Sequence, residues 1–223
     1  MDGILPIWNN NLTKFNHNSI LPRSFRMLII GAFGCGKSVL LLKMLLYPNY
    51  LDYNNLIIFS KTIHQPEFQL LFHGFKNQLS KTTIFNIFKN QEKIPEEIKK
   101  RDLCECFHHD TKNEINVTMS NKFSDIIPCK DLNKIQKNLI VYDDCVNDKN
   151  QEIMESYFTR ARDTNCCCIY LSQNYYELDR RSIRGNSNFF VFFELNKKDQ
   201  DNIYNDKFSN IIDESDFNNY KKY

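Results

Sequence analysis

The chain has 223 residues, 42% of them hydrophobic and 25% charged, and its formal net charge at pH 7 is +2. This length suits one α/β domain with extensions and is sufficient to bury a large core. The nearly neutral charge excludes a protein that is basic over its whole surface, so any contact with DNA must come from a local patch or from several subunits together.

The cysteines and the hydropathy of the chain limit the class of protein further. Eight cysteines are present, and three of them, Cys166, Cys167 and Cys168, are consecutive within an apolar run. This pattern is typical of buried thiols in a reducing, intracellular compartment and not of a disulfide framework. No apolar run approaches the roughly 20 residues that span a bilayer, and Met1–Pro6 lacks the basic and apolar regions of a signal peptide. We therefore expect neither a membrane partner nor secretion.

The first third of the chain alternates between predicted strands and helices. Residues 1–24 are polar and rich in Asn, and we interpret them as an N-terminal arm. Apolar runs and helix-start signals then predict a strand near 26–30, a helix over 37–47, a strand over Asn55–Ser60 and a helix from Gln65 to Phe75.

The middle of the chain, residues 76–136, carries the weakest pattern, and only a helix around Pro95–Arg101 is predicted there. Regular periodicity returns afterwards, with strands over Asn138–Tyr142, Cys166–Leu171 and Phe189–Phe193 and helices over 150–162 and 198–205. Strands separated by helices indicate an α/β fold whose central, mostly parallel β-sheet is sandwiched between α-helices. We expect one domain over 25–205, with the poorly defined stretch as an insertion and 206–223 as a C-terminal tail.

The most informative motif lies directly after the first predicted strand. Gly31–Ser38 fits the pattern G-x-x-x-x-G-K-[ST] and leads into an apolar helix. Loops of this kind wrap the phosphates of a nucleotide with backbone N–H groups, and the following helix presents its N-terminal dipole to the same anion. The alternative is an ordinary glycine-containing turn, which seldom has both a strand before it and a helix after it. The residues expected to bind the nucleotide are Gly31, Ala32, Phe33, Gly34, Cys35, Gly36, Lys37, Ser38 and Val39.

Two of these residues have chemically distinct roles. The Lys37 ammonium can reach the β- and γ-phosphates, and the Ser38 hydroxyl can ligate Mg²⁺. ATP and Mg²⁺ are therefore the expected cofactors, although nothing in the motif selects ATP over GTP.

Two adjacent carboxylates follow the strand Asn138–Tyr142. At the end of a buried strand, Asp143 is placed to organise the Mg²⁺ ligands and Asp144 to polarise an attacking water. The alternative is a solvated turn at a strand end, and the glycine loop upstream favours the catalytic reading.

Three further polar residues are candidates for catalysis. Gln173 follows the strand Cys166–Leu171 and should emerge at the carboxyl edge of a parallel sheet, close to the γ-phosphate. Arg160 and Arg162 follow the acid pair and are candidates for a finger that reaches the site of a neighbouring subunit. The alternatives are a capping or loop glutamine and the solvated end of a helix.

Two other clusters are weaker candidates. Arg180, Arg181 and Arg184 form a basic group that we assign to subunit contact or to the DNA backbone, with a solvated face as the alternative. The segment Cys104–His109 gathers four possible zinc ligands, which Cys129 or Cys145 would have to complete. Its spacing fits no common zinc finger, so a plain loop is favoured.

Taken in order, the motifs resemble a known family. The segments that carry the resemblance are Pro22–Ser38, Leu56–Thr62, Gln65-Pro66, Leu139–Cys145, Tyr157–Arg162, Ile169–Gln173 and Ile183–Asn186. Together they resemble the genome-packaging ATPases of the FtsK–HerA superfamily, in the poxvirus-like branch, and most of all the versions in virophages and Polinton/Maverick elements. One departure is Asp163, where that branch often has a histidine.

The resemblance implies a RecA- or FtsK–HerA-like P-loop NTPase fold and a motor that drives double-stranded DNA into a preformed viral capsid. It implies a homo-oligomeric ring, a hexamer or pentamer, located in the virion or in a viral factory of the host cell. The family's functional residues map onto Lys37, Ser38, Asp143, Asp144 and Gln173, with a finger on Arg160 or Arg162. Two other readings stay open, a P-loop nucleoside or nucleotide kinase and an NTP-gated assembly protein that does not hydrolyse its ligand.

Overall fold

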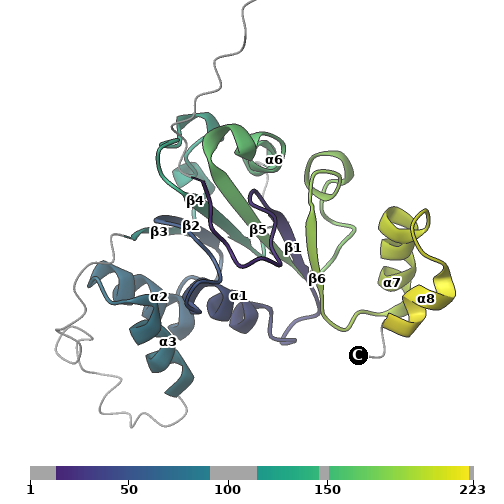
Figure 1. Ribbon diagram of the computed structural model, residues 1–223, viewed down its shortest axis with the longest axis horizontal. Helices are drawn as coiled ribbons and strands as arrows, with labels where there is room; N and C mark the ends of the chain where they lie inside the picture. Colours follow the sequence, from purple (N-terminus) through teal and green to yellow (C-terminus); the bar gives the residue numbers. More distant parts are fainter. Residues whose placement is uncertain (1–13, 91–114, 146–150, 221–223) are drawn as a thin grey trace, which may run out of the picture.

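A six-stranded sheet, with all strands parallel, forms the centre of the computed structural model, which describes residues 14–90, 115–145 and 151–220 (Figure 1). The strands are β1 (Arg26–Ile30), β2 (Asn55–Ser60), β3 (Asn116–Ser120), β4 (Asn138–Asp143), β5 (Cys166–Ser172) and β6 (Phe189–Phe192). Their order across the sheet is β3-β2-β4-β5-β1-β6, and every neighbouring pair is parallel. The α/β fold predicted from the sequence is confirmed.

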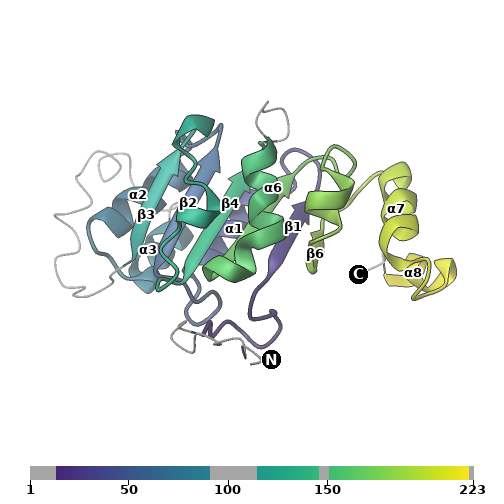
Figure 2. The same ribbon diagram turned by 90° about the horizontal axis from the view of Figure 1, so that it is seen from above.

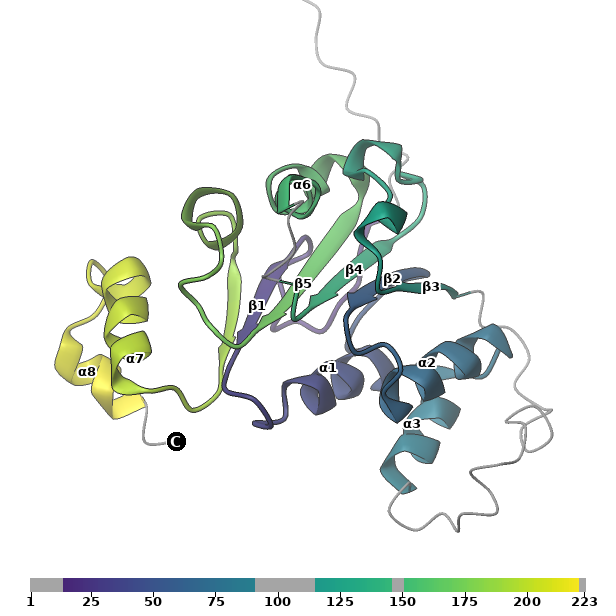
Figure 3. The same ribbon diagram turned by 180° about the vertical axis from the view of Figure 1, so that it is seen from behind.

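Helices cover both faces of the sheet. One face is covered by α1 (Lys37–Leu46), α2 (Pro66–Lys76) and α3 (Lys81–Asn90), and the other by α6 (Gln151–Arg160) (Figures 1 and 2). Beyond the edge strand β6, the chain continues into α7 (Lys197–Ile203) and α8 (Glu214–Tyr220), which stand beside the sheet (Figure 3).

The central strands are apolar except at their ends because both of their faces are buried. In β1, Met27 and Ile29 face the cluster under α1, α2 and α3, whereas Leu28 and Ile30 face the cluster under α6. The three consecutive cysteines divide in the same way, since Cys167 lies in the first cluster and its two neighbours in the second. All three are buried free thiols, as their position within an apolar run predicted.

The structure adds elements to the stretch that the sequence left undefined. Helix α3 and strand β3 both lie within 76–136, and neither was predicted. The first turn of α3 is capped by Ser80, whose Oγ accepts a hydrogen bond of 3.0 Å from the Thr83 N–H. Strand β3 is short, lies at the edge of the sheet and alternates between exposed and more buried positions, so its sequence lacks a continuous apolar run.

Other predictions for this part of the chain fall outside the described residues. These are the helix around Pro95–Arg101 and the possible zinc ligands of Cys104–His109. The expected boundaries of the arm, the domain and the tail stay predictions. Within the residues that the structure does describe, no helix is long and apolar enough to cross a membrane.

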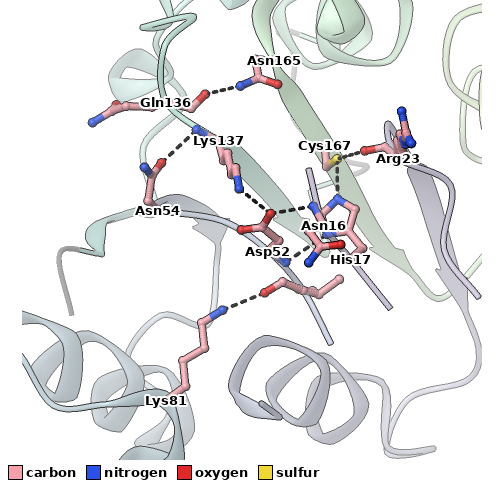
Figure 4. A network of polar contacts seen from close by, with 11 residues as sticks. Asn16, His17, Arg23, Asp52, Asn54, Lys81, Gln136, Lys137, Asn165 and Cys167 are labelled. Atoms are coloured by element: carbon pink, nitrogen blue, oxygen red, sulfur yellow. Dashed lines mark hydrogen bonds and ion pairs between the residues drawn. The ribbon is translucent and has the colours of Figure 1, made fainter. Parts of the chain in front are cut away.

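The described part of the N-terminal segment packs at the amino ends of the strands. Phe15 is buried, and the ring of His17 lies between the rings of Phe15 and Phe25, at centroid distances of 4.8 and 5.0 Å. His17 Nδ1 accepts a hydrogen bond of 3.0 Å from the Asp52 N–H, and its Nε2 lies 3.4 Å from Cys167 Sγ (Figure 4). The segment is therefore tied to β5 and to the residues that precede β2.

Charged groups surround this contact. The Asp52 carboxylate forms an ion pair of 2.6 Å with Lys137 and accepts a hydrogen bond of 2.6 Å from the Asn16 N–H (Figure 4). Lys81 donates to the Leu51 carbonyl at 2.7 Å. Burial lowers the pKa of His17 from 6.5 to about 4, a shift that Lys137 and Lys81 reinforce and that Asp52 opposes.

We expect the contact of His17 to weaken on acidification. The unfolded chain takes up a proton at His17 near pH 6.5, whereas the folded chain does so only near pH 4, so its contribution to stability is complete above the higher value and is lost as the pH falls between the two. His17→Gln removes the titrating group. Urea unfolding at about pH 7 and about pH 4.5 should show a larger loss of stability for the native chain than for this variant. Equal losses would contradict the prediction.

Candidate nucleotide-binding site

The predicted site residues meet at the carboxyl edge of the sheet. Since all six strands are parallel, the segments that follow them emerge at the same edge. The glycine loop follows β1, the acid pair is at the end of β4, and Gln173 follows β5, which lies between the other two strands. The structure thus brings Lys37, Asp143, Asp144 and Gln173 to one edge.

The loop between β1 and α1 has the backbone that its glycines permit. Gly34 and Gly36 have φ angles of 75° and 100°, in the region that disfavours residues with a Cβ. At the start of the loop, a Cβ on Gly31 would lie 2.6 Å from both Cys35 Sγ and Phe193 Cβ, so only glycine fits. The tip carries Phe33, which is 87% exposed. The loop leads directly into the N–H groups at the start of the ten-residue helix α1, which is the arrangement that phosphate-binding loops use to hold an anion.

Lys37 lies over this loop. Its Nζ donates hydrogen bonds to the carbonyl oxygens of Gly31 and Ala32, at 2.7 and 2.9 Å. An ammonium group has three N–H donors, so the loop accounts for two of them. Ser38 is half-buried in the first turn of α1, and Val39 follows it on the exposed side.

Asp143 is held by two hydroxyl groups from β2 and the residues after it. The carboxyl is only 6% exposed, and it accepts hydrogen bonds from Ser60 Oγ at 2.8 Å and Thr62 Oγ1 at 3.4 Å. Burial raises the pKa of Asp143; the neighbouring Asp144 adds to the rise, while the bond from Ser60 and the charge of Lys37 oppose it. The roles of Ser60 and Thr62 were not predicted from the sequence. The only sequence signal for them was a hydroxyl at the end of a buried strand.

This environment suits a magnesium ion. The hydroxyl of Ser38 and the carboxylate of Asp143 are hard oxygen ligands, the kind that Mg²⁺ prefers. A nearby cation would also favour the ionised form of Asp143, whose burial otherwise opposes ionisation. The residues therefore fit the ion that the sequence pattern implies.

Asp144 turns away from the strand axis. Its φ of 52° is in the left-handed region, and its N–H donates to the Leu171 carbonyl at 3.2 Å. This turn exposes its carboxylate, which accepts a hydrogen bond of 3.4 Å from Gln173 Nε2. An exposed carboxylate beside an amide is suited to orient a water molecule, whereas the buried Asp143 is suited to hold a cation.

The two candidate finger residues lie elsewhere. Arg160 is the last residue of α6, is exposed, and precedes the amino end of β5. It therefore lies at the edge of the sheet opposite the glycine loop. Arg162 lies in the short 3-10 helix Ala161–Thr164, and its side chain is outside the described residues. From this position Arg160 does not reach the candidate site of its own chain, so a finger role would need a second subunit, and the alternative is the solvated end of a helix.

The prediction for the basic cluster after β5 is wrong for one of its three residues. Arg184 is buried and not part of a solvated or DNA-facing surface. Its guanidinium lies 4.9 and 4.7 Å from the rings of Tyr175 and Tyr176 and pairs with Asp206 at 3.4 Å. It joins the turn after β5 to the segment after α7. The sequence could not show this because Asp206 is far from Arg184 along the chain, whereas Arg180 and Arg181 are exposed as expected.

The two cysteines considered as further zinc ligands have other contacts. Cys129 Sγ lies 3.3 Å from Thr164 Oγ1, and Cys145 Sγ donates to the Asp143 carbonyl at 3.3 Å. Among the residues that the structure describes, no group of three or more His, Cys, Asp and Glu side chains could hold a metal ion.

The parallel sheet with a glycine loop between its first strand and first helix defines a P-loop NTPase fold. The chain is similar to solved structures of the genome packaging NTPase B204 from Sulfolobus turreted icosahedral virus 2. In complex with AMP, that protein is 10% identical over 85% of each chain, with a TM-score of 0.48. In complex with AMPPCP it is 11% identical over 83% of each chain, with a TM-score of 0.45. No family model matches the chain, and no curated protein sequence matches it.

Proposed function

We propose that this chain is an Mg²⁺-dependent ATPase that acts as an oligomeric ring and packages double-stranded viral DNA into a preformed capsid. The observation that carries the ATPase part is the meeting of the glycine loop, the buried Asp143 and the Asp144–Gln173 pair at one edge of the sheet. A loop that binds phosphates, a ligand for a cation and an exposed base are the parts that phosphoryl transfer to water requires.

Each residue of the site would have a role in ATP hydrolysis that follows from its position. The loop N–H groups and the start of α1 would bind the phosphates, and Lys37 would exchange a loop carbonyl for a phosphate oxygen. Ser38 and Asp143 would hold Mg²⁺, which supplies positive charge to the phosphates. Asp144, oriented by Gln173, would accept hydrogen bonds from the attacking water.

The motor part of the proposal rests on the ordered motifs and on the position of Arg160. The segments that resemble packaging ATPases include the loop, the acid pair and the strand-end Gln173, which the fold brings to one edge. Arg160 is exposed at the opposite edge, so a role in catalysis requires a second subunit. A ring would also let modest basic patches act together on DNA phosphates, which the near-neutral charge of one chain does not allow.

The proposal is tested by the ATP turnover of the full chain with and without linear double-stranded DNA, over a series of protein concentrations. We expect DNA to stimulate turnover and the specific rate to rise steeply with protein concentration. Lys37→Ala should abolish turnover because no ammonium then reaches the phosphates. Lys198→Ala, which removes the same charge from the exposed first turn of α7, is the matched control and should have no effect.

The contrary outcomes separate the other candidates. Turnover that changes neither with added DNA nor with protein concentration would contradict the proposal of a motor. Phosphate transfer to an added nucleoside would identify a kinase. Binding of ATP without turnover would identify a nucleotide-gated assembly protein.

A further inference from the structure

A cavity of about 350 Å³ adjoins the glycine loop on the side away from the acid pair. It lies between one side of α1 and the edge strand β6 with the residue that follows it. Its lining residues are Gly36, Val39, Leu40, Lys43, Val191, Phe192 and Phe193. The volume is within the range of small-molecule sites, which are about 300–1,000 Å³ and mostly apolar.

Phe193 links this cavity to the loop. Its N–H donates a hydrogen bond of 2.8 Å to the Ile30 carbonyl, so it is fixed to the last residue of the strand that leads into the loop. Its side chain lies against the loop backbone: a Cβ on Gly31 would be 2.6 Å from Phe193 Cβ, and one on Gly36 would be 3.8 Å from Cε1. One aromatic side chain thus forms a wall of the cavity and a support of the loop.

The strand order gives the cavity its place relative to a bound nucleotide. Asp143 and Asp144 are on β4 and Gln173 follows β5, on one side of the loop strand β1, whereas β6 is on the other side. A triphosphate whose terminal phosphate faces the acid pair therefore extends its other end toward β6. We propose that this cavity binds the base and sugar of the nucleotide, with the base against Phe193. The inference rests on the proposed function in one respect, that the loop binds the phosphates.

The lining also predicts how selective this subsite is. Apart from glycine and apolar side chains, it contains only Lys43, which has hydrogen-bond donors and no acceptor. Strong discrimination between bases needs a site built to pair with their polar edges, whereas an apolar pocket separates similar ligands only weakly. Adenine and guanine both carry acceptors such as N7, which a donor like Lys43 could pair with, and neither finds a side-chain acceptor in this lining for its own donors. The site therefore accepts both purines.

The test is the affinity of the full chain for ATP, GTP and inorganic tripolyphosphate in the presence of Mg²⁺, measured by titration calorimetry. We expect the dissociation constants of ATP and GTP to agree within about tenfold. Phe193→Ala should weaken ATP binding about 10- to 100-fold, the usual effect of losing an aromatic contact with a base. Binding of tripolyphosphate should stay the same, because it needs only the loop, and alanine keeps the Cβ that lies against Gly31.

Two further variants keep the test decisive. Leu40→Trp fills the cavity from a half-buried position of α1 that follows the loop residues, so it should lose ATP affinity while keeping tripolyphosphate affinity. Tyr47→Ala removes an exposed aromatic side chain at the other end of α1, outside the cavity, and should change neither. Unchanged ATP affinity in a folded Leu40→Trp or Phe193→Ala variant would overturn the inference and leave the proposed function intact. A native chain that binds neither ATP nor tripolyphosphate would overturn the proposed function itself.

Discussion

Asp144→Asn is expected to lower the rate of ATP hydrolysis about 10²- to 10⁴-fold while leaving ATP affinity nearly unchanged. The carboxylate is exposed at the strand edge beside Gln173, at 3.4 Å, where it can accept a proton from an attacking water. Its amide isostere cannot accept that proton. Asp143, which is buried and bonded to Ser60, keeps its place as the candidate ligand of Mg²⁺.

The backbone makes this substitution informative. Asp144 has a φ of 52°, a conformation that Asn tolerates about as well as Asp and that most other residues disfavour. Asp144→Asn therefore removes the charge without straining the turn, whereas an alanine there would change both. Single-turnover hydrolysis and a separate binding titration measure the two effects. Asp216→Asn removes an equal charge from an exposed position in α8 and serves as the control.

A rate unaffected by Asp144→Asn would mean that this carboxylate does not act on the water. A loss of affinity equal to the loss of rate would mean that Asp144 holds the metal or the nucleotide instead. Either result would contradict the division of roles between the two adjacent acids.

The largest effect is expected from the arginine finger. Of Arg160→Ala and Arg162→Ala, the variant that lacks the finger should lose about 10³- to 10⁵-fold in turnover and keep its ATP affinity, and the other should retain most of the rate. The physical reason is that the guanidinium neutralises charge that develops only in the transition state. Arg160 is exposed at the end of α6, at the sheet edge opposite the loop, so as the proposed finger it would deliver its charge to a neighbouring subunit.

Mixing two inactive variants tests delivery between subunits. A chain without the finger still has an intact Asp144, and an Asp144→Asn chain still has the finger, so their shared interface restores one complete site. We expect a mixture of the two to recover a measurable fraction of native turnover, rising with the probability of mixed neighbours. Mixed oligomers that form without any recovery would contradict a finger supplied by a second subunit, and so would full activity of both single arginine variants.

Much of the fold followed from local sequence. The strands β1, β2, β4 and β5 were predicted within a residue of their bounds, because a parallel strand buried on both faces is a nearly continuous apolar run. Strand β6 is half-buried at the sheet edge and was predicted as closely because all four of its residues are apolar. Strand β3 and helix α3 were not predicted, because neither has a strong local pattern. Strand β3 alternates between exposed and more buried residues at the edge of the sheet, and few residues of α3 are fully buried.

The sequence by itself determined the phosphate loop, the acid pair and the parallel sheet, since each depends on residues that are adjacent along the chain or on local periodicity. Only the tertiary structure decided which side chains meet. Ser60 forms a hydrogen bond with Asp143, which is 83 residues away along the chain. The buried Arg184 forms an ion pair with Asp206, and Phe193 lines a cavity beside the first helix. Contacts of this kind are set by the order of the strands, which places distant segments side by side, and no local pattern records that order.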